Sequence, residues 1–258
     1  MRVEQVGDGT PEIAVVAGIH GDEPCGVRAV ERLLDEPLTV DRPVKFIVAN
    51  EEALDRGERF VDTDLNRAFP GESTADEHER RLAAAITAEI ADCLTLALHS
   101  TQSYAEPFAV VNGIDDTARD ICPQLSVAAV VETSEYIEGR IFAAGRAIEI
   151  EAGLQGSDQA EENALRIIRE FLTATGVLPG DTMRRDVPAY KLLRPIDKEQ
   201  AESYEVFAEN FKRVDAGEPF AAADGEELTA EDDFYPVLLS PYGYANVFGY
   251  AAEKIDTL

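Results

Sequence analysis

Short apolar runs alternate with longer amphipathic segments over the first two thirds of the chain. Runs this short and this rich in Val, Ile, Leu and Ala are typical of strands that are buried on both faces. The segments between them repeat their apolar positions at helical spacing, which predicts helices that connect the strands. The predicted strands are Ile13–Ile19, Lys45–Asn50, Cys93–His99, Phe108–Asn112, Val127–Glu132 and Ala147–Glu151, and the predicted helices are Pro24–Leu34, Ala75–Ala91 and Ser157–Thr175.

The pattern changes after Gly176, where Gly and Pro become frequent and no long helical period remains. Short runs separated by turn residues are typical of β structure. We therefore expect an α/β domain over residues 1–176 and a small β-rich domain over residues 177–258. The predicted fold class is α/β, with a mixed, mainly parallel sheet flanked by helices.

The net charge of the chain limits the classes of binding partner that it can have. The 258 residues include 51 Asp and Glu against 23 Lys and Arg, which gives a formal net charge of −28. This balance excludes non-specific nucleic-acid binding, which needs a basic face, and it argues against docking on anionic membranes. We interpret the excess acid as halophilic adaptation, because molar salt screens most of the self-repulsion.

The cysteines and the N-terminal residues bear on the compartment. Cys25, Cys93 and Cys122 form no Cys-x-x-Cys pair, so they predict neither a disulfide framework nor a thiolate zinc site. The N-terminal residues lack the pattern of an export signal, and no apolar run reaches the length of a membrane span. We expect a reduced, cytoplasmic setting.

Two of the three histidines stand at the ends of predicted strands. His20 follows the run that ends at Ile19 and precedes Glu23 by three residues, and His99 ends a second strand. The carboxyl ends of parallel strands share one edge of a sheet, where α/β proteins build their sites. Two imidazoles and a carboxylate, with a fourth position left for water, are the ligand set of a catalytic zinc site. We predict one Zn²⁺ per chain on these side chains, whereas His78, in a charged helix start, is expected to face solvent.

A zinc-bound water needs a general base, and the segment IEIEAGLQG offers two carboxylates. Glu149 and Glu151 alternate with isoleucines, so both are expected on one face of the strand. The alternation alone leaves open which of the two is the base.

Four motifs occur in an order that resembles the succinylglutamate desuccinylase/aspartoacylase family of zinc carboxypeptidase-like hydrolases. They are GIHGDEPCG, RFVDTDLNRAFPG with Asn50 before it, ALHS and IEIEAGLQG, and the resemblance covers roughly residues 13–156. The resemblance implies a zinc carboxypeptidase-like fold. It also implies zinc ligands at His20, Glu23 and His99, carboxylate binding by Asn66 and Arg67, a carbonyl-polarising arginine at Arg59 with Arg56 as the alternative, and a general base at Glu151.

Substrate selection is less well defined by the motifs. The family holds a second substrate carboxylate with an arginine shortly before the base, and Arg140 and Arg146 are the two candidates because the local spacing departs from the family pattern. Tyr242 and Tyr244 resemble the tyrosine that closes such sites, and Tyr244 is the predicted substrate contact. The alternative for both tyrosines is a place in a β core.

The resemblance implies a zinc-dependent amidohydrolase that cleaves the amide bond of a small anionic N-acyl amino acid. A zinc carboxypeptidase acting on peptide C-termini would use the same residue types. A catalytically silent module that holds a carboxylate ligand is the third interpretation. We expect no nucleic-acid or membrane partner, and a homo-oligomer stays open.

We expect the stability and activity of this chain to rise with KCl up to molar concentrations, because the screening length falls to about 3 Å at 1 M salt. Thermal unfolding and activity measured over a KCl series would check this. Full stability at millimolar ionic strength would contradict the halophilic interpretation.

Overall fold

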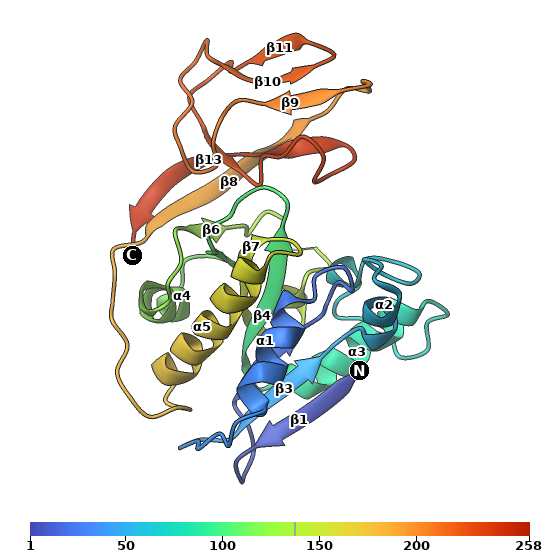
Figure 1. Cartoon of the computed structure of the whole chain (residues 1–258), viewed down its shortest axis with the longest axis vertical. Helices are drawn as coiled ribbons and strands as arrows, with labels where there is room; N and C mark the ends of the chain where they lie inside the picture. Colours follow the sequence, from blue (N-terminus) through green and yellow to red (C-terminus); the bar gives the residue numbers. More distant parts are fainter. Residues whose placement is uncertain (137) are drawn as a thin grey trace.

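The computed structural model describes residues 1–136 and 138–258 and contains a ten-stranded mixed sheet with the strand order β1-β3-β2-β4-β7-β5-β6-β8-β13-β12. Parallel pairing joins β3, β2, β4 and β7, and a second parallel group consists of β5, β6 and β8. The predicted fold class is confirmed (Figure 1). The strands of the α/β part are β1 (Arg2–Val6), β2 (Ile13–Ala17), β3 (Val44–Val48), β4 (Leu94–Thr101), β5 (Phe108–Val111), β6 (Val130–Glu132) and β7 (Arg146–Leu154).

Helices cover both faces of this sheet because its central strands are apolar on both sides. In β2, Val15 and Ala17 pack into the core formed with α1 and α5, whereas Ala14 and Val16 pack into the core formed with α3. Continuous apolar strands are the consequence of such two-sided burial. The helices are α1 (Cys25–Leu34), α2 (Glu51–Arg56), α3 (His78–Ile90), α4 (Asp116–Ile121) and α5 (Asp158–Ala174).

Local capping explains where some helices begin. Ser157 caps α5 by accepting a hydrogen bond from the backbone N–H of Ala160 at 3.1 Å, which agrees with the start predicted from the sequence. Asn50 caps the short helix α2 in the same way, with Ala53 as the donor at 3.3 Å. The hydrophobic pattern missed α2 and α4, which are too short to develop a helical period, and it missed β1, an exposed edge strand with no apolar run.

The C-terminal strands divide between two sheets. β8 (Pro188–Asp197), β12 (Tyr235–Val237) and β13 (Val247–Thr257) extend the large sheet, and β8 pairs with β6. β9 (Tyr204–Val206), β10 (Pro219–Ala223) and β11 (Glu226–Thr229) form a separate three-stranded antiparallel sheet, seen at the top of Figure 1. The domain division at residues 176 and 177 stays a prediction, and the hydrogen bonds of the large sheet continue across it.

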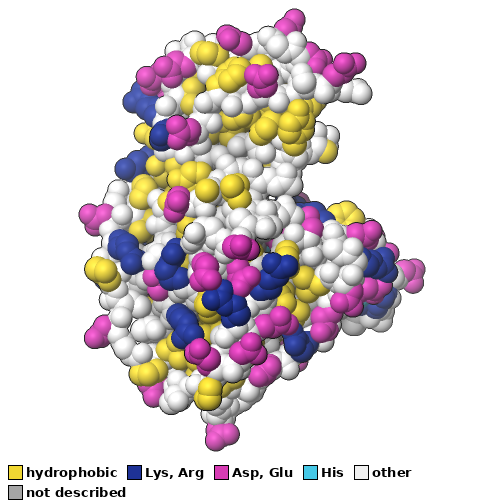
Figure 2. Space-filling view, in the orientation of Figure 1, with side chains coloured by type: hydrophobic (Ala, Val, Ile, Leu, Met, Phe, Trp, Pro, Cys, Tyr) yellow, Lys and Arg dark blue, Asp and Glu magenta, His cyan; other side chains and the backbone are white. Residues whose placement is uncertain are grey.

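Acidic side chains are spread over both parts of the surface shown in Figure 2, interspersed with lysines and arginines. Cys25, Cys93 and Cys122 are buried free thiols. Within the described ranges, no helix combines the length and the apolar character needed to cross a bilayer.

Glu79 is a buried carboxylate that organises the loop between α2 and α3. Its oxygens accept hydrogen bonds from three successive backbone N–H groups, those of Val61, Asp62 and Thr63, at 2.6, 3.0 and 3.1 Å. The side-chain amide of Asn50 donates a fourth at 3.0 Å. Burial alone would raise the pKa of Glu79, but these donors lower it below the ordinary glutamate value.

The neighbouring residue His78 is only partly exposed. Its Nε2 lies 3.2 Å from Oδ1 of Asn50, and its Nδ1 lies 3.6 Å from a carboxylate oxygen of Glu52. The expectation that this ring faces solvent is therefore wrong in part, because α2, which the sequence pattern missed, packs beside it.

Glu79→Gln is expected to lower the free energy of unfolding at pH 7 by about 2 kcal/mol or more, because charge-assisted hydrogen bonds are lost. The folded-state pKa is below the unfolded one, so this stabilisation is complete above about pH 4.3 and is lost as the pH falls further, through the folded pKa. Urea unfolding at pH 7 and below pH 4 should show the difference between the two proteins shrink. Glu77→Gln, an exposed carboxylate beside it, is the control, and an equal effect there would contradict the assignment.

Candidate functional site

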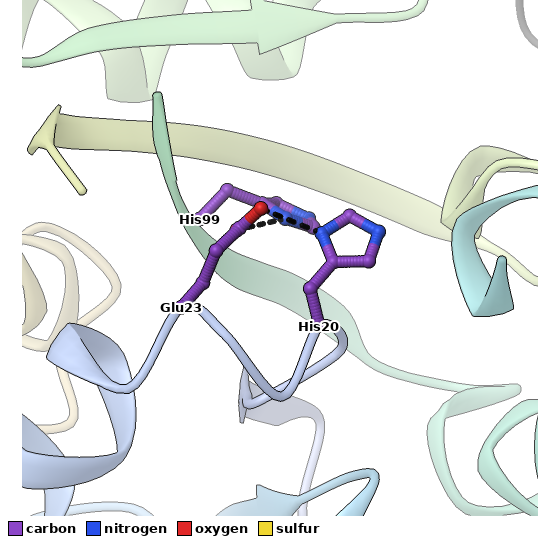
Figure 3. A group of neighbouring side chains, drawn as sticks. All are labelled: His20, Glu23 and His99. Carbon is purple, nitrogen blue, oxygen red and sulfur yellow. Dashed lines mark hydrogen bonds and ion pairs between the residues drawn. The ribbon is translucent and has the colours of Figure 1, made fainter. Parts of the chain in front are cut away.

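Three buried side chains converge at the carboxyl edge of the central strands. His20 and Glu23 lie on the loop between β2 and α1, and His99 lies in β4, the strand beside β2 (Figure 3). The two carboxylate oxygens of Glu23 lie 2.9 Å from His20 Nδ1 and 3.1 Å from His99 Nδ1. One potential ligand atom from each side chain lies within 4.8 Å of the others. The sequence-predicted ligand set is thus brought together in space.

The loop that carries His20 and Glu23 is held by close packing. A Cβ atom on Gly21 would lie 2.1 Å from the backbone carbon of Ala53, so α2 approaches the loop too closely for any other residue. From the opposite side, the side-chain amide of Gln155 donates to the backbone oxygen of Asp22 at 2.8 Å. The loop is fixed between α2 and the end of β7.

Asp64 has a role that sequence reasoning did not assign. Its Oδ1 lies 3.0 Å from His20 Nε2, the ring nitrogen that faces away from Glu23, and its Oδ2 accepts from Arg59 at 3.2 Å. Burial opposes ionisation, but the His20 hydrogen bond and the nearby arginines keep the pKa of Asp64 well below its usual range. A carboxylate on the outer nitrogen of a ligand histidine fixes the ring orientation. The signal was present in the DLNR motif, whose first residue is Asp64.

The cluster suits a divalent cation in its donor chemistry and its charge. Two imidazoles and one carboxylate are typical zinc ligands. Burial by itself lowers the pKa of His20, but Glu23 and Asp64 overcome this effect and raise it to about 9. The side chains therefore attract positive charge to their centre, and a metal ion would satisfy the same requirement as bound protons.

Glu151 stands beside His99 on the next strand. The two residues are direct partners in the parallel ladder between β4 and β7, so their side chains share a face of the sheet. Oε2 of Glu151 is buried and has no hydrogen-bond partner among the described residues. Burial, with added repulsion from Glu23 and Glu149, raises the pKa of Glu151 to about 7. A buried carboxylate with this pKa can exchange a proton near neutral pH.

Glu149 lies on the same face of β7 but in different surroundings. It is almost completely buried, it forms an ion pair with Arg140, and it accepts a hydrogen bond from Asn66 Nδ2 at 2.7 Å. Burial opposes ionisation, yet Arg140 lowers the pKa of Glu149 below its ordinary value. Glu149 is a fixed anion, whereas Glu151 is poised to take up a proton.

The candidate arginines separate into two groups. Arg59 donates to Glu23 Oε1 at 2.9 Å, and Arg59, Arg67 and Arg140 line the same cavity as the His-Glu-His cluster. Arg56 instead pairs with Glu52 on the exposed side of α2, and Arg146 is an exposed residue at the start of β7, far along the strand from Glu151. The geometry favours Arg59 over Arg56 and Arg140 over Arg146.

The cavity has a volume of about 530 Å³, a size suited to a small-molecule ligand. Its C-terminal wall includes Tyr244, whereas Tyr242 is 63% exposed. Lys198 holds the loop of Tyr244 by donating from Nζ to the backbone oxygens of Pro241 and Tyr244, each at 2.7 Å. The C-terminal residues therefore form one wall of a cavity that residues at the strand ends of the α/β part also line.

Residues 9–122 match the sequence profile of the succinylglutamate desuccinylase/aspartoacylase catalytic domain. A probable aspartoacylase of Trichodesmium erythraeum is 23% identical over 90% of this chain and 92% of that protein. A succinylglutamate desuccinylase of Pseudomonas fluorescens is 37% identical, but over 28% of this chain and 22% of that enzyme. The predicted family resemblance is confirmed.

Solved structures share the fold over nearly the whole chain. The product-bound ectoine utilization protein of Ruegeria pomeroyi has a TM-score of 0.80 at 18% identity and covers 98% of this chain and 87% of its own. Murine aminoacylase 3 has a TM-score of 0.77 at 20% identity, with 98% of both chains covered. The likeness therefore includes the C-terminal strands that close the cavity.

Purified protein is expected to retain one zinc ion per chain after dialysis, and His99→Ala is expected to lower the zinc content at least tenfold. Zinc should raise the melting temperature of the parent chain, because it binds only the folded cluster, and should leave that of His99→Ala unchanged. Elemental analysis and thermal unfolding check both results. His78→Ala is the matched control, and an equal loss of zinc in it would contradict the assigned ligand set.

Proposed function

We propose that this chain, which belongs to the succinylglutamate desuccinylase/aspartoacylase family, is a zinc-dependent hydrolase that cleaves the amide bond of an N-acyl amino acid. The observation that carries the proposal is the placement of Glu151. Its buried carboxylate, with one oxygen free of any described partner, faces the same cavity as His20, Glu23 and His99. A proton acceptor beside a metal-ligand set is what hydrolysis of an unactivated amide requires.

A zinc ion held by His20, Glu23 and His99 would supply an activated water and polarise the acyl carbonyl. Glu151 would remove a proton from the attacking water and later deliver it to the amine that leaves. The raised pKa of Glu151 suits both transfers, since the group must accept a proton in one step and release it in the next. His99 and Glu151, paired across adjacent strands, keep the base close to the ligand set.

Arginines would bind the substrate around this centre. Arg59 is fixed by Glu23 and Asp64, which aims its positive charge at the edge of the ligand set, where negative charge develops on the carbonyl oxygen. Arg67 lines the cavity and is exposed, and the one hydrogen bond of its side chain to a described residue is to the backbone oxygen of Asn66. Its guanidinium is free to bind the substrate carboxylate through two parallel bonds.

Two other functions remain as alternatives. A carboxypeptidase needs an open groove for the peptide, whereas the Tyr244 loop, held by Lys198, forms one wall of this cavity. A silent carboxylate-binding module has no need for a buried carboxylate with the raised pKa of Glu151. Both observations favour the deacylase.

The proposed function is tested by primary-amine release from zinc-loaded protein in molar KCl. The substrates are N-acetylaspartate, N-succinylglutamate, neutral N-acetyl amino acids and an N-blocked dipeptide. We expect release from at least one N-acyl amino acid, and Glu151→Gln is expected to lower kcat by about 1,000-fold, the middle of the range for loss of a general base.

The zinc content of Glu151→Gln should stay at one per chain, since this residue is not a proposed ligand. Glu132→Gln, a buried carboxylate on β6 outside the cavity, is the matched control and should keep its activity. Release from the dipeptide alone would identify a carboxypeptidase. Silence over the whole panel with zinc bound would identify a binding module.

A further inference from the structure

Glu149 has no role in the proposed reaction, although it is 1% exposed and lies two residues before Glu151 on the same face of β7. A buried ionised carboxylate is costly unless it is fully paired, so its partners show what it does. Its hydrogen-bonded partners are the side chains of Asn66 and Arg140, and both were expected from the sequence to bind substrate. His99 Nε2 lies 3.7 Å from Glu149 Oε1, so the proposed metal-ligand set borders the same carboxylate.

Asn66 is held on both ends of its amide. Nδ2 donates to Glu149 Oε1 at 2.7 Å, and Oδ1 accepts from the backbone N–H of Ile141 at 3.0 Å. The side chain is buried, so its orientation is set by these two bonds. Asn66 therefore already has a carboxylate partner before any substrate binds.

Arg140 reaches the same carboxylate from the other side. The loop before it crosses the Asn66–Arg67 segment at Gly139, where φ is +71° and a Cβ would lie 2.3 Å from the backbone oxygen of Arg67. This contact brings Arg140 onto Glu149 Oε2, and burial keeps the side chain of Arg140 at 15% exposure. Its positive charge is neutralised inside the protein.

A second substrate carboxylate would have to share Arg140 and Asn66 with Glu149 or displace it. Sharing places two anions together in a poorly solvated site, which costs several kcal/mol. Displacement would leave Glu149 buried without its partners, which is equally unfavourable. The site thus disfavours dianionic substrates.

The cavity beyond Glu149 has the opposite character. Val110 is the direct partner of Glu149 in the β5–β7 ladder, and Val131 is the next partner across the sheet. Apolar side chains continue this surface from β5, β6, β8 and the C-terminal wall: Phe108, Val110, Val131, Leu192, Val237 and Leu238. These apolar side chains are almost completely buried, and uncharged polar residues, among them Thr133 and Ser240, line the cavity beside them. This part of the cavity therefore suits an uncharged group better than a charged one.

We propose that Glu149 is a specificity-determining residue that takes the place of a second substrate carboxylate. The preferred substrates are then N-acyl amino acids whose α-carboxylate is their single charge and whose acyl group or side chain is apolar. This inference rests on the proposed deacylase function for its kinetic consequence. The occupation of Arg140 and Asn66 by Glu149 also has a consequence for binding that does not depend on turnover.

The kinetic test compares N-acetylleucine with N-acetylaspartate, which are similar in size and differ in charge. The parent chain is expected to prefer N-acetylleucine by at least 100-fold in kcat/KM. Glu149→Ala should shift this ratio toward N-acetylaspartate by about 100-fold, in line with removal of a like-charge contact of several kcal/mol. Adding Arg140→Ala to Glu149→Ala should abolish the shift. A parent chain that prefers N-acetylaspartate would overturn the proposal, as would Glu149→Ala losing both activities without a shift.

The binding test uses succinate and zinc-free protein, with thermal unfolding as the readout. Succinate should stabilise Glu149→Ala more than it stabilises the parent chain or Glu132→Ala, because only in Glu149→Ala can it also fill the vacated position against Arg140. Glu149→Thr is the second variant, in case the alanine variant does not fold, since a β-branched residue suits a strand and also lacks the carboxylate. Absence of this additional succinate stabilisation in the folded variants would overturn the proposal. If the parent chain cleaves neither substrate, the proposed function fails, and the succinate result still decides the role of Glu149.

Discussion

Burial of carboxylates is the constraint on which this structure depends. An ionised carboxylate removed from water must be surrounded by donors or positive charge, so each buried acid fixes the groups around it. Glu79 accepts hydrogen bonds from three backbone N–H groups and thereby fixes the conformation of the loop that leads to the DLNR segment. Glu23 gathers His20, His99 and Arg59 at the end of the parallel strands. The metal-ligand set and the loop beside it are thus organised by the same requirement.

Glu149 and Glu151 show how that requirement separates two chemically identical groups. They are two residues apart on the same face of β7; Glu149 is almost completely buried, and Glu151 is partly buried with its Oε2 inaccessible to solvent. Glu149 contacts Arg140 and Asn66, which stabilise its anion. Burial, together with the negative charges of Glu23 and Glu149, raises the pKa of Glu151 to about 7. The Glu149 anion contributes because a permanent anion nearby makes a second one less favourable, whereas Arg140 acts in the opposite direction. The charge on Glu149 therefore helps to set the pKa of Glu151.

The sequence could predict the parts of this arrangement that are local or follow from strand alternation. His20 and Glu23 lie three residues apart on one loop, and the central strands have an unmistakable apolar pattern. Contacts between distant segments could not be predicted: Asn66 reaches Glu149 over 83 residues and His20 reaches Asp64 over 44. The alternation of β7 placed both glutamates on one face but carried no information on which would meet an arginine. The pairing of β8 with β6 could likewise not be predicted, since the residue pattern of one strand does not specify which strand lies beside it.

The apolar residues that line the cavity lie on strands of the large sheet, and this placement bears on the proposed selectivity. Phe108, Val110, Val131 and Leu192 belong to β5, β6 and β8, which are hydrogen-bonded neighbours in the large sheet. Their positions are set by strand register and not by a mobile loop, and Glu149 is held in the same register by its pairing with Val110. Asn210 fixes the C-terminal wall to this frame by bonding the backbones of Ser103 and Leu239. Because the charge and the apolar surface are both carried by one sheet, the proposed selectivity could be altered by substitutions on the strands without requiring the loop that holds His20 and Glu23 to move.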